Sequence, residues 1–227
     1  MIIEKLTRNT IPLTSTVETD NFIATSEIAF DCSYDGISKF YEWNLPNNLP
    51  NKYRIGVIVG NSGSGKTTLL KKFGVEETLT WNPNKSIISH FTTPNDGINK
   101  LSAVGLNSIP SWYKSYDILS NGEKFRADLA RKLKSNSVID EFTSVVDRNV
   151  AKATCVSLSK YVANNNLENI VISTCHYDIL DWLKPDWIID TDSGELRSGF
   201  FLSDQKLKLK YIEPTMILGE CLKTIII

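Results

Sequence analysis

The chain has 227 residues, of which 41% are hydrophobic and 22% are charged, and its formal net charge at pH 7 is −1. This composition is ordinary for a globular protein that buries a sizeable core, and the nearly neutral charge gives no general argument for nucleic-acid binding. No segment approaches the run of about 18 apolar residues that a membrane-spanning helix needs.

The N-terminal residues and the cysteines indicate the cellular compartment in which we expect the protein. Residues 1–5 lack the long apolar region of a secretory signal, so we expect a cytoplasmic protein. No two cysteines form a C-x-x-C pair, which favours free thiols over a disulfide framework or a zinc site. The cysteines are Cys32, Cys155, Cys175 and Cys221.

Residues 1–53 are expected to form a β-rich lead-in, because β-branched residues alternate there with turn signals such as Asp35-Gly36. We expect strands at 22–24 and 27–30. In the stretch Phe40-Tyr41-Glu42-Trp43, one aromatic ring could stack on a nucleotide base, and packing in a small core is an equally good interpretation.

The strongest motif has the form G-x-x-x-x-G-K-[ST]. It consists of Gly60, Asn61, Ser62, Gly63, Ser64, Gly65, Lys66 and Thr67. Its glycines let backbone N–H groups turn inward around phosphates, where a Cβ would clash. Lys66 is expected between the β- and γ-phosphates, and the Thr67 hydroxyl is expected to bind Mg²⁺. A strand at 55–59 and a helix at 68–73 should flank the loop, with the helix N-terminus facing the phosphates. The loop predicts a nucleotide site.

The next elements are less distinctive. We expect a strand at 86–89 that ends at His90, then a polar link and a short helix at 98–104. A helix at 124–133 follows the sequence Leu119-Ser120-Asn121-Gly122-Glu123. There Ser120 is a natural N-cap, and Glu123 completes a capping box. By itself this pattern predicts a well-capped surface helix.

Two carboxylates follow a short apolar strand at 138–139. Asp140, at the end of a strand beside a phosphate loop, can support Mg²⁺. Glu141 can orient and deprotonate a water molecule, provided that it lies within hydrogen-bond reach. A pair of solvated acids is the usual alternative, and the neighbouring motifs make it the weaker one here.

The rest of the chain alternates helix and strand signals. We expect a helix at 148–164, a strand at 169–173 followed by a lone histidine, His176, and strands at 187–190 and from 195. Residues 205–212 alternate lysine with apolar residues. This lysine face is most simply solvated or edge-protecting. The alternative is a patch for nucleic acid or an acidic partner, together with the basic cluster Lys124, Arg126, Arg131, Lys132 and Lys134. The terminal 224–227 is too short for a membrane anchor.

In this order the motifs resemble those of the ATP-binding-cassette (ABC) ATPases, over residues 55 to 196. The resemblance covers the phosphate loop at 60–67 (Walker A), the signature at 119–123, the segment 138–141 (Walker B), the following residues 142–147 (the D-loop), and His176. It implies an α/β fold: a P-loop NTPase core with a mainly parallel sheet, an N-terminal antiparallel β subdomain and a reduced helical subdomain. One domain, 1–227, would then comprise the lead-in 1–53, the core 54–200 with the signature region at about 92–134, and a C-terminal strand or tail at 201–227.

The resemblance also implies site roles and an assembly. Ser120 and Gly122 would contact the γ-phosphate of ATP held by the other subunit of a homodimer. Asp147 would lie in the loop that crosses the dimer interface. His176 would contact the γ-phosphate and help to hold Glu141 and the attacking water. ATP and Mg²⁺ are the implied cofactors, and the choice between ATP and GTP stays open.

Three departures from the family pattern matter. The only glutamine is Gln205, so the glutamine that the family has between Walker A and the signature is absent. His90 is the positional candidate to replace it. Because that glutamine is missing, ATP hydrolysis can be slow. Only 54 positions separate Lys66 from Ser120, which leaves little room for a helical subdomain that docks on membrane partners. Asn121 and Phe142 stand where transporter ATPases commonly have glycine and proline.

Three functional hypotheses follow. The first is a soluble ATPase that acts as an ATP-driven homodimeric switch, with a further protein partner as an open question. In detail, residues 119–126 and 140–148 look like the ATPase part of predicted ABC ATPase–acetyltransferase proteins of bacteria and phages. The alternatives are a nucleic-acid-associated, repair-type ABC ATPase and the nucleotide-binding subunit of a membrane transporter.

Overall fold

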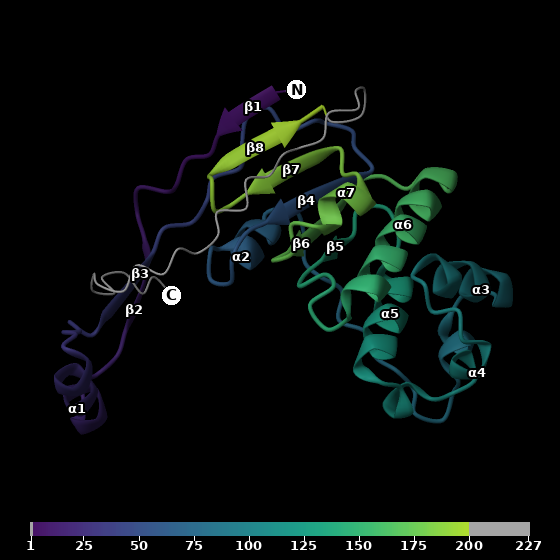
Figure 1. The fold of residues 1–227 in the computed structure, drawn as a ribbon, viewed down its shortest axis with the longest axis horizontal. Helices are drawn as coiled ribbons and strands as arrows, with labels where there is room; N and C mark the ends of the chain where they lie inside the picture. Colours follow the sequence, from purple (N-terminus) through teal and green to yellow (C-terminus); the bar gives the residue numbers. More distant parts are fainter. Residues whose placement is uncertain (1, 200–227) are drawn as a thin grey trace.

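A six-stranded sheet forms the centre of the computed structural model, which describes residues 2–199 (Figure 1). Its strand order is β1-β8-β7-β4-β6-β5. The four strands from β7 to β5 are mutually parallel, whereas β8 and β1 extend one edge in antiparallel fashion. The bounds are β1 Ile2–Lys5, β4 Ile55–Val59, β5 Val138–Ile139, β6 Ile170–Thr174, β7 Trp187–Asp190 and β8 Glu195–Ser198. The expected α/β architecture with a mainly parallel sheet is confirmed.

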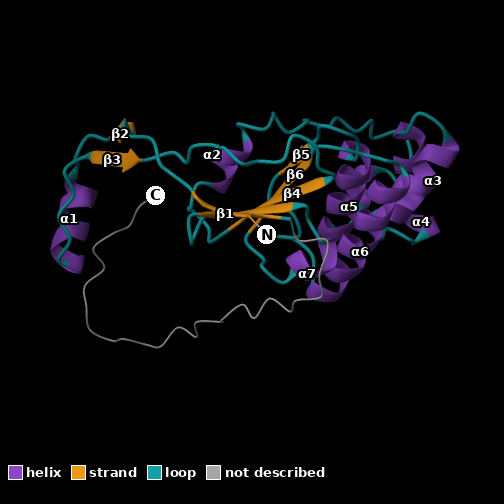
Figure 2. Ribbon diagram, turned by 90° about the horizontal axis from the view of Figure 1, so that it is seen from above, coloured by secondary structure: helices purple, strands orange, loops and turns teal. Residues whose placement is uncertain are grey.

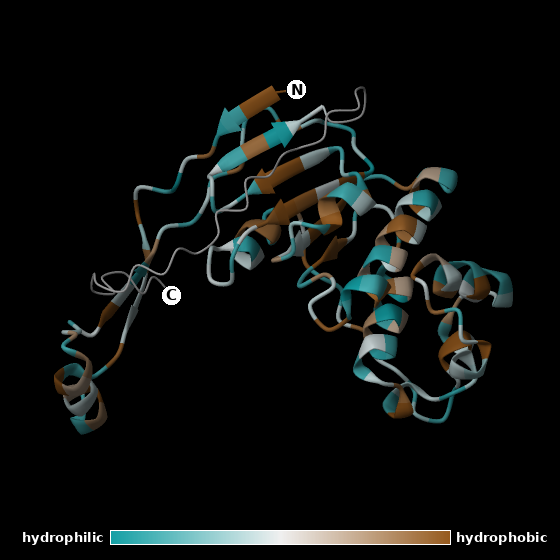
Figure 3. Ribbon diagram, in the orientation of Figure 1, coloured by the Kyte–Doolittle hydropathy of each residue, from teal (hydrophilic) through white to brown (hydrophobic). Residues whose placement is uncertain are grey.

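Two hydrophobic cores cover the faces of this sheet, because successive side chains of a strand point to opposite sides. Every residue of β4 and β6 is buried, as expected for parallel strands covered on both faces, and Figure 3 shows these central strands in hydrophobic colours. Val57 packs with the helices on one face, and Ile58 packs with α2 and Trp187 on the other. The flanking helices are α2 Lys66–Leu70, α5 Asn121–Lys132, α6 Arg148–Asn164 and α7 Ile179–Leu183.

The parallel strands determine where the motifs meet. The phosphate loop follows β4, the two carboxylates follow β5, and His176 follows β6. Because these strands are parallel neighbours, their carboxyl ends share one edge of the sheet, and the segments that follow them converge there. The helix expected at 68–73 begins earlier, at Lys66, and ends at Leu70; residues 71–73 form a turn.

A small helical part lies between α2 and β5. It comprises α3 (Pro94–Ala103), α4 (Ile109–Trp112) and α5, with short 3-10 turns at Ile87–His90 and Tyr116–Ile118. Helix α3 packs against α5 and α6, and the Thr93 side chain caps it by accepting from the N–H of Asp96. The expected helix at 98–104 is therefore confirmed, with an earlier start. The expected strand at 86–89 is wrong, because the hydroxyls of Ser86 and Ser89 close a turn, 2.8 Å apart.

An arm, residues 11–40, projects from the core on the side opposite the helical part (Figures 1 and 2). It consists of β2 (Leu13–Thr16), α1 (Asn21–Phe30) and β3 (Ile37–Phe40), and β2 pairs antiparallel with β3. The strands expected at 22–24 and 27–30 are wrong, because both runs lie in the single helix α1. The Asp20 carboxylate starts that helix by accepting the N–H groups of Phe22 and Ile23, at 3.0 Å each.

Some expectations concern residues that the structure does not describe. The lysine-rich strand at 205–212, the tail at 224–227 and Cys221 lie outside residues 2–199. Within the described part, Cys32, Cys155 and Cys175 are free thiols. In that same part, no helix has both the length and the apolar character required to cross a membrane.

Candidate nucleotide site

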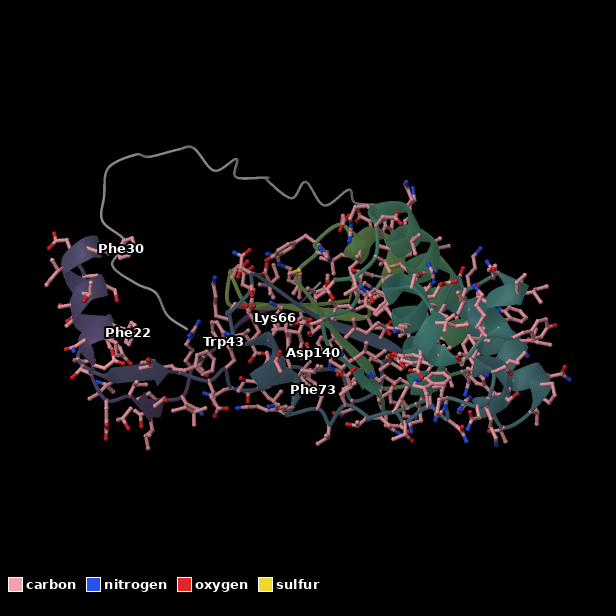
Figure 4. The ribbon with its side chains drawn as sticks, turned by 90° about the horizontal axis from the view of Figure 1, so that it is seen from below. Phe22, Phe30, Trp43, Lys66, Phe73 and Asp140 are labelled. Atoms are coloured by element: carbon pink, nitrogen blue, oxygen red, sulfur yellow. The ribbon has the colours of Figure 1, made fainter. Side chains whose placement is uncertain are left out.

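The phosphate loop and the two carboxylates surround one cavity of about 370 Å³ at the carboxyl edge of the sheet. Figure 4 shows Lys66 and Asp140 close to each other, between the arm and the helical part. The predicted residues that line this cavity are Ser62, Gly63, Gly65, Lys66, Thr67, Asp140 and Glu141. The sequence motifs from two different strands are thus brought together. Cys175 also lines the cavity, with an exposed thiol.

The far side of the loop is anchored to residues that follow β7. Gly60 has φ +154°, and a Cβ there would lie 2.0 Å from Thr191 Oγ1, so this close approach requires glycine. The Ser64 and Thr191 hydroxyls are 2.6 Å apart, and the Asn61 N–H donates to the carboxylate of Asp192 at 3.0 and 3.1 Å. Lys66 Nζ donates to Asn61 O at 2.6 Å across the loop. These contacts fix the conformation of the loop.

One buried and one exposed carboxylate, Asp190 and Asp192, support that anchor. Tyr177 Oη donates to Asp190 at 2.9 Å and to Asp192 at 3.0 Å. Burial first, and then the two carboxylates, raise the pKa of Tyr177, so its hydroxyl remains a donor. Sequence reasoning missed Thr191, Asp192 and Tyr177, because nothing in their local pattern indicates contact with a loop more than a hundred residues away.

Three aromatic residues near the loop have different roles. Phe40 lines the cavity, and a Cβ on Gly65 would lie 2.7 Å from its Cζ. Trp43 is buried, and its indole N–H donates to Ser64 O at 3.0 Å. Tyr41 is exposed, and its backbone carbonyl accepts from Arg8 Nη1 at 3.3 Å. Of the three rings, Phe40 is therefore the one that lines the cavity, and Trp43 supports the loop.

The end of β5 holds the two carboxylates in a tight turn. Ser173 Oγ donates to Asp140 Oδ1, which also accepts the N–H of Glu141 at 2.9 Å. Glu141 has φ +48°, an uncommon conformation for a residue with a side chain and one that often occurs at functional sites. The N–H of Phe142 donates to Ser173 O at 2.9 Å. Proline has no N–H and could not make this bond.

The oxygen atoms in this cavity fit a magnesium ion. The Thr67 hydroxyl and the Asp140 carboxylate both line it. Mg²⁺ prefers oxygen ligands and is commonly held by one or two protein groups together with the phosphates of a substrate. Thr67 and Asp140 are therefore the residues that would hold Mg²⁺ here.

Glu76 is a further contact of the Walker B turn that sequence reasoning missed. Its Oε1 accepts from Lys132 Nζ, in the last turn of α5, at 2.8 Å. The same oxygen accepts from the N–H of Asp140 at 3.3 Å. Glu76 and Lys132 also line a second cavity together with Asp140 and Glu141. In the sequence, Glu76 and Glu77 are two adjacent acids after a helix and carry no signal of this contact.

The signature serine caps α5 as predicted. Ser120 Oγ and the Ser120 N–H donate to Glu123 Oε2 at 2.8 and 3.0 Å, and the N–H of Glu123 donates to Ser120 Oγ at 3.4 Å. Ser111 Oγ donates to the other carboxylate oxygen at 2.6 Å. These bonds, that of Ser111 first, lower the pKa of Glu123 to about 2. Ser120 and Gly122 do not line the 370 Å³ cavity of their own chain.

The D-loop lies beside the signature turn. A Cβ on Gly122 would be 3.4 Å from Val146 Cγ1, so the two segments are in contact. Asp147 caps α6, because its Oδ1 accepts the N–H groups of Asn149 and Val150 at 2.9 and 3.0 Å. The carboxylate of Asp147 is thus used within its own chain.

His176 lies next to the Walker B turn. Its Nδ1 is 3.2 Å from Thr143 Oγ1, and its backbone N–H donates to Thr174 Oγ1 at 3.1 Å. Burial, followed by the charge of Arg148, lowers the pKa of His176, so the ring is neutral at neutral pH. His176 itself does not line the cavity, whereas the preceding residues Thr174 and Cys175 do.

The structure does not bring His90 to the phosphate site. Its Nε2 accepts the N–H of Asn82 and its Nδ1 donates to Ser86 O, both at 2.9 Å. The ring also packs edge-on against Trp81, with centroids 4.8 Å apart. Both ring nitrogens are used within one surface segment, and His90 does not line the cavity. The prediction that His90 replaces the missing glutamine is therefore wrong: it rested on a strand at 86–89 that does not form.

Comparison with known proteins gives a structural likeness only. No protein-family model and no curated protein sequence matches the chain. The dimeric structure of MJ0796, described as a bacterial ABC transporter cassette, is 16% identical in sequence and has a TM-score of 0.51. The match covers 83% of this chain and 94% of that one. A second MJ0796 structure, a post-hydrolysis state bound to ADP and Pi, is 15% identical, with a TM-score of 0.48 and the same coverage of both chains. The chain therefore has the fold of an ATP-binding cassette.

Proposed function

We propose that this chain is an ABC-type ATPase that binds and hydrolyses ATP as a soluble, cytoplasmic switch. The observation that carries the proposal is the convergence of Lys66, Thr67, Asp140 and Glu141 on one cavity. These four side chains come from two segments more than 70 residues apart. They supply the groups that phosphoryl transfer to water requires, which are an anion cradle, magnesium ligands and a carboxylate base.

Each residue has a defined role in this proposal. The loop 60–67 and Lys66 hold the phosphates, and Thr67 and Asp140 hold Mg²⁺, which would neutralise developing charge. Glu141 accepts a proton from the attacking water as that water bonds to the γ-phosphorus and the bond to ADP breaks. His176, neutral and fixed by Thr143, contacts the γ-phosphate. The Phe40 ring lies against the base.

We infer that the site is completed by a second copy. Ser120 and Gly122 form an ordered turn at the start of α5, but they lie outside the cavity of their own chain. In a head-to-tail homodimer, this turn of one subunit covers the phosphates bound by the other, and the segment up to Asp147 lies at the interface. ATP then closes the dimer, and hydrolysis followed by product release reopens it. The dimer of MJ0796, a protein with the same fold, supports this arrangement.

The motif residues at 119–126 and 140–148 favour a relation to the ATPase part of ABC ATPase–acetyltransferase proteins. The small helical part, α3 to α5, supports this choice over a transporter subunit. Stimulation of hydrolysis by DNA or RNA, with a steep salt dependence, would favour a repair-type ATPase instead. Co-purification with an integral membrane protein would favour a transporter subunit.

The test is the mass in solution of the Glu141→Gln protein with and without Mg-ATP. Removing the base while keeping its shape should trap the closed state, so we expect an ATP-dependent monomer-to-dimer shift. Ser120→Arg should abolish the shift, whereas Asn164→Arg, at the far end of α6, should not. Wild-type protein should release phosphate from ATP, and the Glu141→Gln protein should not. A monomer under saturating ATP would refute the homodimeric switch.

A further inference from the structure

Helix α1 is rich in hydrophobic residues but packs against neither hydrophobic core of the protein. None of its residues is buried, and Phe22, Ile28 and Phe30 are 85%, 85% and 79% exposed. Ten residues are too few for a helix to be stable in water by itself, and a helix that is apolar on several sides is normally covered. Large apolar side chains exposed together on one short helix indicate an interaction site. Figure 4 shows Phe22 and Phe30 at the end of the arm, away from the core.

The arm is also strongly acidic. Between Asn9 and Ser38 there are five acids and no lysine or arginine; the acids are Glu18, Asp20, Glu27, Asp31 and Asp35. Two arms facing each other would bring these carboxylates together, and that repulsion argues against arm-to-arm pairing. Complementarity instead requires an apolar surface that carries basic residues.

The base of the arm adjoins the phosphate loop. Strand β3 ends at Phe40, whose ring lies against Gly65. The cavity that Lys66 lines is bounded by Phe40 at the base of the arm and by Asp140 and Glu141 after β5. The arm and the chain's own helical part lie on opposite sides of the sheet (Figure 2). A protein segment that covers phosphates bound in this cavity would therefore lie next to the base of the arm.

The signature end of the helical part has the matching chemistry. Tyr113 and Ile118, seven and two residues before the signature serine, are 68% and 66% exposed. The exposed Lys114 lies between them in sequence, and Lys124 follows in the first turns of α5. Across residues 94–134 there are seven lysines and arginines against four acids. The exposed Asp117 also lies in this segment, and Lys100, Lys132 and Lys134 are paired with acids of their own chain. Lys114 and Lys124 are therefore the cations that can face the acidic arm.

The geometry points to the arm as a clasp for a second copy of this chain: α1 and β3 of one subunit hold the segment 113–118 and the start of α5 of the other. The inference rests on the proposed head-to-tail dimer. Ile118 is only two residues from Ser120. If Ser120 of one copy reaches the phosphates of the other, Ile118 arrives beside Phe40, where the arm begins, and the segment back to Tyr113 extends along the arm toward α1. The clasp would then make closure depend on the arm as well as on ATP.

The first test measures the dissociation constant of the ATP-bound Glu141→Gln dimer by sedimentation equilibrium. Replacing Phe22 and Phe30 together by serine should weaken the dimer by about tenfold or more, because two large apolar contacts are lost. Since α1 is not part of either core, the variant should still fold and bind ATP. The matched control is Ile3→Ser, at a 54% exposed position on the edge strand β1, and it should leave the constant unchanged.

The second test locates the contact. Two differently tagged chains, one carrying Phe22→Cys and the other Tyr113→Cys, are mixed in a background whose native cysteines are serine. A short bismaleimide should link the two tags in the presence of Mg-ATP and not in its absence. Because each chain carries a single thiol, a link between the tags can only be intermolecular.

The outcomes separate this inference from the proposed function. If the phenylalanine variant dimerises like its parent while Ser120→Arg abolishes dimerisation, the switch stands and the clasp is refuted. The arm then serves a different protein. The same conclusion follows if no cross-link forms within a dimer of normal stability. If the Glu141→Gln protein remains monomeric with Mg-ATP, both the homodimeric switch and the clasp are refuted.

Discussion

Glu76 provides a sharp test of how the end of α5 is joined to the Walker B turn. Its carboxylate accepts from Lys132 Nζ at 2.8 Å and from the N–H of Asp140 at 3.3 Å. The Glu76 and Lys132 side chains are 32% and 19% exposed. A hydrogen bond to a charged group contributes about 1.5–3 kcal/mol, and partial exposure reduces this value. We therefore expect Glu76→Ala to lower the free energy of unfolding by about 1–2 kcal/mol.

Glu77 supplies the matched control. It pairs with Lys134 at 2.6 Å, but these side chains are 45% and 59% exposed, and no contact to Asp140 is recorded. Exposed ion pairs contribute about 0–1 kcal/mol, so Glu77→Ala should have the smaller effect. Urea unfolding followed by tryptophan fluorescence measures both variants.

The two variants should also differ in catalysis. Loss of the bond to the Asp140 N–H loosens the turn that carries Glu141, so Glu76→Ala should lower kcat by about tenfold, equivalent to roughly 1.4 kcal/mol. The KM for ATP should change little, because the phosphate loop is untouched. Glu77→Ala should leave both parameters near their original values. Equal effects of the two substitutions on stability and on kcat would refute the role assigned to Glu76.

Three further predictions follow from other parts of the structure. Gly56→Ala places a Cβ 2.0 Å from Trp187 Cζ2 inside a packed core, so we expect a loss of about 2 kcal/mol or more in urea unfolding, and an unchanged midpoint would contradict this. The pKa of Glu123 is about 2 in the folded protein against an ordinary 4.5, so its stabilisation is complete above pH 4.5 and is lost as the pH falls toward 2. Glu123→Gln should therefore flatten the pH dependence of unfolding in that window, and parallel curves for the two proteins would be evidence against the cap. Phe40→Ala should raise the dissociation constant for ATP by about tenfold through lost stacking, whereas Tyr41→Ala should not, and fluorescence titration with a labelled nucleotide distinguishes them.

The sheet and the loop were predictable because their signals are local and mutually consistent. The run at 55–59 is apolar throughout, as a strand covered on both faces must be, and the glycine pattern directly after it has one well-known use. The capping box at Ser120 likewise lies within four residues. Where each motif follows a strand of one parallel sheet, the shared edge brings distant motifs together.

The predictions that failed concern segments whose structure depends on contacts with distant parts of the chain. The residues at 22–24 and 27–30 have β-propensity, but the Asp20 cap and the absence of a neighbouring strand favour one helix. The strand expected at 86–89 has no sheet to join, so the serines close a turn, and the role assigned to His90 disappears with it. Contacts such as Glu76 with Asp140 join segments 64 positions apart. No local pattern encodes them.

The pairing of β2 with β3 has a consequence for how the sequence of this protein can diverge in evolution. Leu13 lies opposite Phe40, and paired Cα atoms in antiparallel strands are only about 5 Å apart. The backbone therefore leaves the body of the protein and returns to it at almost one point. Everything beyond that point can be shortened, replaced or exchanged with a tight turn while the path through the sheet is conserved. The arm can therefore diverge in sequence and length independently of the sheet and of the loops that follow its strands.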